Sequence, residues 1–324
     1  MGIKGLNHFL KTTCFNNIYH ISLNTLRGKT IVIDASIYLY RFKCDNMLIE
    51  GIYQMISQFE YYNITSIFVF DGKPPVEKND VIQERRLVKR EAEQKYYDTK
   101  DLIEKKELQD TCTLKREMEV LRKKIVKVSK SDTQKVKQLL SLMGVSYYEC
   151  DGESDSICAF MVQTNQAYAC LSEDMDLFVY GTRRVLRYLS LLKSTVVIYD
   201  IEGMLLTLGL TFKDFQDICV LSGSDYNKKD AIDFNCSLNM FTKYRESGVI
   251  TSYGDWMIEK KHMDSDGFKR AIELFDISHI TIERDRFIKS DGNNNKLKEF
   301  LETYGFIFGI SNIKDTSSLN YIKF

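Results

Sequence analysis

The chain has 324 residues, 44% of them apolar, with 45 basic and 45 acidic side chains. It is long enough to bury a substantial core, whereas its apolar runs fall short of the roughly 18 residues that a membrane-spanning helix needs. These features exclude a transmembrane protein, and neither a signal peptide nor a myristoylation pattern is recognisable. The eight cysteines show no metal-binding spacing. We therefore expect a soluble protein of a reducing intracellular compartment, nuclear or cytoplasmic.

Charge is distributed unevenly along the chain. Residues 73–137 hold 19 Lys and Arg against 13 Asp and Glu, a surplus of about six positive charges that the rest of the chain balances. A net charge of zero would argue against binding to nucleic acid, because phosphate contacts require Lys and Arg. The local surplus removes that objection for one part of the chain.

Four short runs of β-branched, aromatic and other apolar residues predict buried parallel strands. They cover residues 30–33, 66–70, 168–171 and 195–199. Helical stretches lie between them, which is typical of an α/β fold. Three of the runs lead into acidic residues, at Asp34, Asp71 and Asp174. Because the functional crevice of a parallel sheet lies at the carboxyl ends of its strands, we expect these acids to converge there.

A polar insertion separates the second run from the third, from about residue 78 to about residue 137. It is almost free of Gly and Pro and rich in helix formers, so it should be helical. In its second half apolar residues recur at three- and four-residue steps among Lys and Arg, which predicts a basic amphipathic helix. The apolar positions are Met118, Leu121, Ile125 and Val128. Gly144 is a plausible stop for the helix that follows.

Seven acidic residues form the candidate site. In an extended chain, residues two apart point the same way, so Glu153 with Asp155, and the acids at 174 and 176, could each present two carboxylates. Carboxylates packed together repel, and all-oxygen ligation suits Mg²⁺ or Mn²⁺. Taken singly, each acid can equally be a turn former, a helix cap or a charge at a helix N-terminus. The set is Asp34, Asp71, Glu153, Asp155, Asp174, Asp176 and Asp225.

Five motifs occur in a fixed order along the chain. They are Met1-Gly2-Ile3-Lys4-Gly5-Leu6, Ile33-Asp34-Ala35-Ser36, Phe70-Asp71-Gly72-Lys73-Pro74-Pro75, Ser172-Glu173-Asp174-Met175-Asp176 and Leu221-Ser222-Gly223-Ser224-Asp225-Tyr226. Together they resemble the flap endonuclease / XPG family of 5′ nucleases, well over residues 1–226 and weakly beyond. The resemblance implies a PIN-like α/β fold with a mostly parallel sheet flanked by helices. It also implies a catalytic core at 1–226 with a helical arch at about 78–137, and a helical DNA-binding region at 227–324 packed on the core.

The same resemblance assigns roles to single residues. The family's seven metal-coordinating acids fall on the seven acids above, which implies two Mg²⁺ ions, with Mn²⁺ able to substitute. The acid at position 155 is Glu in flap endonucleases proper, whereas Asp resembles the exonuclease branch, so the branch stays open. Lys78 and Arg85 match the catalytic pair that contacts the scissile phosphate. Exposed, solvated cations are the alternative for both.

Further residues match DNA contacts of the family. Gly2 corresponds to a residue near the DNA junction and Tyr40 to an aromatic on which a base stacks, with a simple turn and core packing as the alternatives. Lys123 and Lys127 belong to the basic arch, beneath or through which a single 5′ strand would pass; a solvated arm is the alternative. Lys78 and Arg85 complete the predicted DNA-binding set.

Two departures from the family lie after residue 226. The segment 230–237 contains no glycine, where the family has a Gly-rich hairpin that holds a monovalent cation against duplex phosphates. Whether that turn binds duplex DNA or a monovalent cation is therefore left open. The last residues also lack a basic tail and a convincing sliding-clamp motif, so recruitment by a clamp is not predicted. We also expect a monomer.

The predicted function is a structure-specific 5′ nuclease, a flap endonuclease or 5′–3′ exonuclease. It would hydrolyse branched or flapped DNA by a two-metal mechanism in replication, repair or recombination. One alternative is a related nuclease acting on other junctions, DNA ends or RNA. Another is a non-catalytic nucleic-acid-binding module. The acidic cluster argues against the latter, because without metal ions it would be electrostatically unfavourable.

Overall fold

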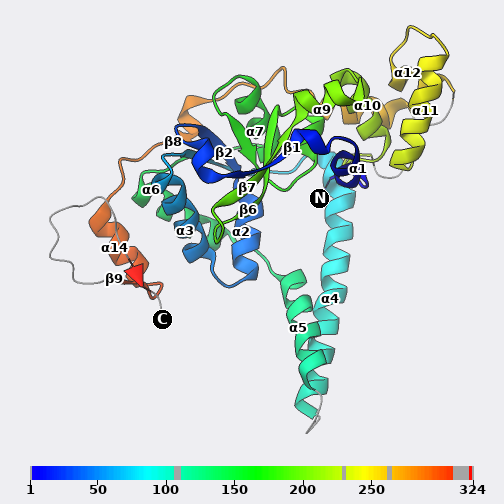
Figure 1. The fold of residues 1–324 in the computed structure, drawn as a ribbon. Coiled ribbons are helices and arrows are strands. Elements are labelled where there is room, and N and C mark those ends of the chain that lie inside the picture. The colour runs from blue at the N-terminus through cyan, green and yellow to red at the C-terminus, as the bar shows by residue number, and fades with distance from the viewer. Residues whose placement is uncertain (1, 106–110, 228–230, 261–264, 309–320, 323–324) are drawn as a thin grey trace.

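A mixed β-sheet forms the centre of the molecule (Figure 1). The computed structural model describes residues 2–105, 111–227, 231–260, 265–308 and 321–322. Within these ranges the sheet has eight strands in the order β1-β7-β6-β5-β2-β3-β4-β8. Their bounds are β1 Ile18–Ser22, β2 Thr30–Asp34, β3 Thr65–Phe70, β4 Ser146–Glu149, β5 Ala169–Leu171, β6 Arg184–Ser190, β7 Thr195–Asp200 and β8 Phe287–Ile288. The five strands from β6 to β4 are parallel, and β1, β7 and β8 pair antiparallel with their neighbours.

The predicted α/β fold is confirmed, with one error of direction. Strands at the first three predicted positions are present and parallel. The fourth, β7, was predicted to be parallel but pairs antiparallel with β6. Only residues 191–194 connect β6 to β7, whereas a parallel connection requires a crossover of about a dozen residues or more. The sequence reasoning did not anticipate β4 or β6, nor the edge strands β1 and β8.

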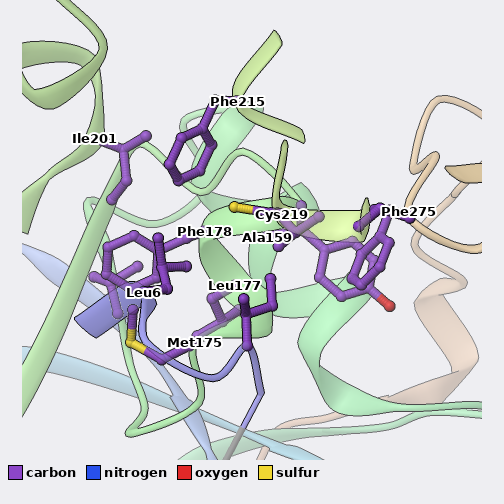
Figure 2. Packing of buried hydrophobic residues seen from close by; sticks show 14 of the residues in the cluster. Leu6, Ala159, Met175, Leu177, Phe178, Ile201, Phe215, Cys219 and Phe275 are labelled. Atoms are coloured by element: carbon purple, nitrogen blue, oxygen red, sulfur yellow. The ribbon is translucent and has the colours of Figure 1, made fainter. Parts of the chain in front are cut away.

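Helices cover both faces of the sheet and enclose two hydrophobic cores. The first core includes Leu6, Phe178 and Phe215 (Figure 2). Its helices are α1 Leu6–Thr13, α7 Ser154–Gln163, α8 Asp176–Val179, α9 Ile201–Leu208, α10 Phe212–Leu221, α11 Phe234–Glu246, α12 Tyr253–Glu259 and α13 Ser265–Leu274. The second core lies under α2 Ala35–Cys44, α3 Leu48–Tyr61, α6 Lys130–Met143 and α14 Asn294–Glu302.

Alternation along β2 shows how one strand serves both cores. Ile31 and Ile33 pack into the second core and Val32 into the first, because successive side chains of a strand point to opposite faces. Short elements complete the fold. They are the 3₁₀ turns η1 Phe15–Asn17, η2 Leu23–Leu26, η3 Val76–Lys78 and η5 Arg284–Arg286, and the antiparallel pair β9 Ile307–Phe308 and β10 Tyr321–Ile322.

The insertion forms an arm of two helices that extends away from the sheet (Figure 1). They are α4 Asn79–Lys105 and α5 Thr111–Ile125, which pack along each other; residues 106–110 lie outside the described ranges. At about 1.5 Å per residue, α4 is about 40 Å long. The helical prediction is confirmed for the described residues, although α5 ends at Ile125, before Val128. As predicted, Gly144 ends α6, in the left-handed conformation with φ of 75°.

The C-terminal region contributes to both layers of the core. β8 adds a strand to the sheet beside β4, and α14 packs against α6. In the described part of the chain, no helix combines the length and apolarity required to cross a bilayer.

Candidate active site

The seven predicted acids gather at the carboxyl end of the parallel strands. Asp34 ends β2, Asp71 follows β3 directly, and Asp174 lies three residues beyond β5. The other four come from helix termini and one turn. Glu153 and Asp155 lie at the start of α7, Asp176 begins α8 and Asp225 follows α10.

The acids are close enough to shift one another's ionisation. Burial, followed by the charges of Asp174, Asp34 and Asp71, holds the pKa of Asp155 well above its usual range. Burial and the charges of Asp174 and Asp225 do the same to the pKa of Asp176. The cluster is therefore one electrostatic unit.

The extended-chain argument for the acid pairs was wrong. Glu153 is the N-cap of α7 and Asp155 lies in its first turn, so helix geometry rather than strand alternation brings them together. Asp176 likewise begins a helix. The alternative of acids that merely mark a helix N-terminus would leave them solvated. Asp155 is only 8% exposed and Asp176 only 2%.

Asp34 is the most thoroughly supported of the acids. It accepts hydrogen bonds from the Ser36 amide at 3.2 Å, from Ser154 Oγ at 3.2 Å and from Ser172 Oγ at 2.9 Å. Burial and the neighbouring charge of Asp71 nevertheless raise the pKa of Asp34 to about 7. Three hydrogen bonds do not offset burial and repulsion, so the cluster favours the entry of positive charge.

The donor set fits a hard divalent cation. Asp155 Oδ1 and Asp176 Oδ1 are buried and make no hydrogen bond, which is rare for buried polar atoms and indicates a missing partner. Every candidate ligand is a carboxylate oxygen, the donor that Mg²⁺ prefers. Among the described residues, no three acidic, His or Cys side chains converge on a single point as they stand. Two cations lie between them instead.

Those cations are Lys78 and Arg85, at the base of the arm. Lys78 Nζ lies 2.5 Å from Glu153 Oε1 and 3.6 Å from Asp225 Oδ2. Arg85 Nη2 lies 2.7 Å from Asp225 Oδ2. Lys78 is only 7% exposed. Burial alone would lower its pKa, but the charges of Glu153 and Asp225 raise the pKa of Lys78 above its ordinary value. The alternative of a solvated cation therefore fails for Lys78, whereas Arg85 is half-exposed.

Five of the seven acids, all except Asp176 and Asp225, line a cleft of about 1090 Å³ between the sheet and the arm. Tyr40 lines this cleft and is 48% exposed, whereas Tyr38 is fully buried. The alternative interpretation, that Tyr40 packs in the core, is therefore wrong. Lys89 and Lys124 of the arm also line the cleft, and the sequence reasoning did not select them.

Lys123 and Lys127 lie outside the residues that line the cleft. Lys123 pairs with Asp45 at 2.9 Å, and both are half-exposed. The adjacent Arg122 donates to the Cys44 carbonyl at 2.6 Å, which fastens the end of α5 to the end of α2. DNA contact by Lys123 and Lys127 stays a prediction.

Gly2 lies directly against the acids. Its φ is 79°, and a Cβ at this position would lie 2.7 Å from Asp176 Oδ1 and 2.9 Å from Asp174 Oδ1. Both the left-handed conformation and the close approach therefore require glycine.

Four hydrogen-bonding residues within the quoted motifs or beside the acids were not selected from the sequence. Ser36 donates to Asp71, the Ser154 amide donates to Asp71 Oδ1 at 2.7 Å, and Ser172 donates to Asp34. Tyr226 donates to Glu153 Oε2 at 2.5 Å. The two motif serines stand two residues from an acid, a spacing that could have identified them.

The glycine-free segment lies only partly within the described ranges, since residues 228–230 fall outside them. Asp233 caps α11 by accepting from the amides of Asn235 and Cys236. Whether this turn binds duplex DNA stays an open question from the sequence.

Comparisons with known proteins agree with this geometry. The XPG N-terminal domain matches residues 1–92 and the XPG I-region matches residues 144–225. Flap endonuclease 1 of Candida tropicalis is 31% identical over 279 residues, which cover 80% of this chain and 71% of that protein. Flap endonuclease 1 of Theileria parva is 31% identical over 85% of this chain, but the match spans only 56% of that protein's length.

Solved structures share the fold. Flap endonuclease-1 from Methanococcus jannaschii superposes with a TM-score of 0.60 at 22% identity, covering 89% of this chain and 90% of that one. The catalytic core of Rad2 in complex with DNA substrate gives 0.63 at 21% identity, covering 92% and 94%. With both family domains matched in order and a relative of more than 30% identity covered over most of its length, this chain belongs to the flap endonuclease / XPG family.

Proposed function

We propose that this protein is a Mg²⁺-dependent, structure-specific 5′ nuclease that cuts DNA near the junction of a 5′ single-stranded flap and a duplex. One observation carries the proposal: seven carboxyls gather at the carboxyl end of the parallel strands, five of them line one cleft, and two buried oxygens of the cluster make no hydrogen bond. Lys78 and Arg85, at the start of the helical arm, form ion pairs with two of these carboxylates. Family membership and the DNA-bound Rad2 structure support the same substrate class.

Two ions are proposed to bind the acids. Asp34, Asp71, Glu153 and Asp155 would hold one, and Asp174, Asp176 and Asp225 the other, with Mn²⁺ able to replace Mg²⁺. When bound, such ions would activate a water and neutralise charge on the phosphate. The water would attack phosphorus and the bond from phosphorus to the 3′ oxygen would break, so the products carry a 5′ phosphate and a 3′ hydroxyl. The serine hydroxyls and amides keep the carboxylates oriented.

The arm is proposed to bind the strand that is cut. Lys78 and Arg85 would leave Glu153 and Asp225 and contact the scissile phosphate, where they stabilise developing negative charge. Lys89 and Lys124 give the cleft further positive charge towards the DNA backbone. The exposed ring of Tyr40 is available for base stacking.

Replacing Lys78 or Arg85 with Ala is expected to lower the single-turnover cleavage rate by about 10²–10³-fold, because a preorganised cation is lost from the transition state. DNA affinity should fall much less. Quenched-flow cleavage and fluorescence anisotropy measure the two quantities. Arg183→Ala is the matched control, since Arg183 is about as exposed as Arg85 and pairs with Glu202 outside the cleft. An unchanged single-turnover rate would remove either residue from the chemistry.

Replacing Gly2 with Ala is expected to lower the cleavage rate by about 10–100-fold, because the new methyl group displaces the Asp174 and Asp176 carboxylates. Gly28→Ala is the control. Gly28 has a φ of 72°, but a Cβ there meets no atom within 4 Å. Both variants should lose roughly 1–2 kcal/mol of stability through backbone strain. Equal cleavage rates in the two variants would contradict this close-approach argument.

A substrate panel tests the proposed function. The protein is incubated with a 5′-labelled flap, a plain duplex end, a four-way junction, a single DNA strand and a single RNA strand, with Mg²⁺ and with EDTA. Cutting that is selective for the flap and requires Mg²⁺ is the expected result. Preference for another substrate would reassign the specificity, and tight binding without cutting would indicate a binding module. Intracellular location and the monomeric state remain predictions from the sequence, which does not predict recruitment by a sliding clamp.

A further inference from the structure

A chain of two tyrosine hydroxyls ends on one of the acids. Tyr180 and Tyr226 have their hydroxyl oxygens 3.2 Å apart, and Tyr226 donates to Glu153 Oε2 at 2.5 Å. The other oxygen of the same carboxylate, Oε1, is paired with Lys78. Glu153 is therefore held at both oxygens, by groups from two different parts of the fold.

The direction of this chain follows from counting protons. An ionised carboxylate only accepts hydrogen bonds, and each tyrosine hydroxyl has one proton to donate. If Tyr226 donates to Glu153, its oxygen must accept the proton of Tyr180. The hydrogen bonds thus run in one direction, from Tyr180 to Tyr226 and from Tyr226 to Glu153. In this arrangement successive hydrogen bonds strengthen one another.

Packing fixes both tyrosines. The fully buried Phe275 contacts the Tyr180 ring at 4.8 Å and the Tyr226 ring at 5.2 Å between centroids, each edge-on. Phe275 follows α13, so the C-terminal region packs against the two tyrosines that lead to Glu153. The hydroxyls have little freedom to turn away from Glu153.

The tyrosines also join three segments that carry acids. Tyr180 is the C-cap of α8, which begins with Asp176. Tyr226 directly follows Asp225. Through Glu153, the same chain reaches the N-terminus of α7.

We propose that Tyr226, supported by Tyr180, is a positioning residue for metal binding: it holds Glu153 Oε2 so that Oε1 is the oxygen offered to a cation in exchange for Lys78. The inference rests on the proposed function, since it concerns how the same acids bind their ions. Partners that orient a metal ligand typically contribute 10–100-fold to metal affinity. Tyr226 is thereby assigned a role distinct from that of the Asp225 next to it.

Metal affinity, rather than activity, separates this role from a structural one. Tyr226→Phe removes a single oxygen and retains the ring that packs on Phe275. Tyr253→Phe is the matched control. Tyr253 is fully buried and donates to the Ser237 carbonyl at 2.7 Å, and its hydroxyl makes no hydrogen bond to any of the seven acids.

The experiment titrates Mn²⁺ into the full-length, DNA-free protein and follows the free Mn²⁺ signal by electron paramagnetic resonance. We expect Tyr226→Phe to raise the Kd for Mn²⁺ about tenfold or more, Tyr180→Phe to raise it less, and Tyr253→Phe to leave it unchanged. An unchanged Kd in Tyr226→Phe, or equal changes in Tyr226→Phe and Tyr253→Phe, would overturn the proposal. If Tyr226→Phe does not fold, Tyr180→Phe decides, and a wild-type Kd there overturns it.

The same titration separates the two proposals. If the wild-type protein binds Mn²⁺ and cuts the flap, and Tyr226→Phe binds Mn²⁺ with wild-type affinity, only the role of Tyr226 is overturned. Wild-type protein that binds no Mn²⁺ overturns the proposed function and this inference with it.

Discussion

Replacing Asp174 with Asn is expected to reduce flap cleavage by at least about 10³-fold. A bound ion contributes several kcal/mol of charge stabilisation, and each 1.36 kcal/mol is about tenfold in rate. Asp174 is 4% exposed, and its Oδ1 accepts from the Asp176 amide at 3.1 Å. The amide oxygen of Asn retains that hydrogen bond, so the substitution removes charge and leaves the local fold intact.

Binding of the flap should change far less than cleavage, because Asp174 lies among carboxylates that repel the phosphate backbone. Single-turnover cleavage in Mg²⁺ and anisotropy of a labelled flap measure the two effects. Asp45→Asn is the control: this half-exposed acid pairs with Lys123 outside the cleft, and cleavage should stay near the wild-type rate. Asp174→Asn protein that still turns over at more than about a tenth of the wild-type rate would exclude Asp174 from the metal site.

How far the sequence predicts this site depends on which contacts are local. The convergence of Asp34, Asp71 and Asp174 follows from strand ends in a parallel sheet, and the structure has them there. Glu153 and Asp155 were placed by the geometry of a strand although they begin a helix. A helix N-terminus was kept as the alternative for these acids, and that is the position the structure shows.

The remaining errors concern long-range geometry. The pattern of a buried strand is the same for parallel and antiparallel pairing, so the direction of β7 depended on recognising β6 and its short connection. Selecting Lys124, which lines the cleft, would have required knowing which side of α5 faces it. DNA contact by Lys123 and Lys127 stays a prediction. The contact between Tyr226 and Glu153 joins residues 73 apart in sequence, and no spacing rule predicts it.

The second large effect concerns stability in the absence of metal. The pKa of Asp34 rises from an ordinary 3.8 to about 7 in the folded protein, through burial first and then the charge of Asp71. Between pH 4 and 7 the folded protein therefore holds a proton that the unfolded chain has released. This term favours folding at low pH and is lost as pH rises through that window. A shift of about three units corresponds to about 4 kcal/mol.

Comparing wild type with Asp34→Asn tests this term together with the effect of the Asp34 charge on its neighbours, such as Asp155, whereas ionisable groups outside the cluster cancel in the difference. Urea unfolding in EDTA at pH 5 and pH 7.5 should show the variant gaining stability relative to wild type as pH rises. A difference that does not change with pH would contradict the repulsive cluster. Mg²⁺ should reverse the ranking at pH 7.5, since an ion that binds only the folded protein stabilises it by mass action. The repulsion that destabilises the empty cluster is the same property that makes it bind cations, so both effects should diminish together in Asp34→Asn.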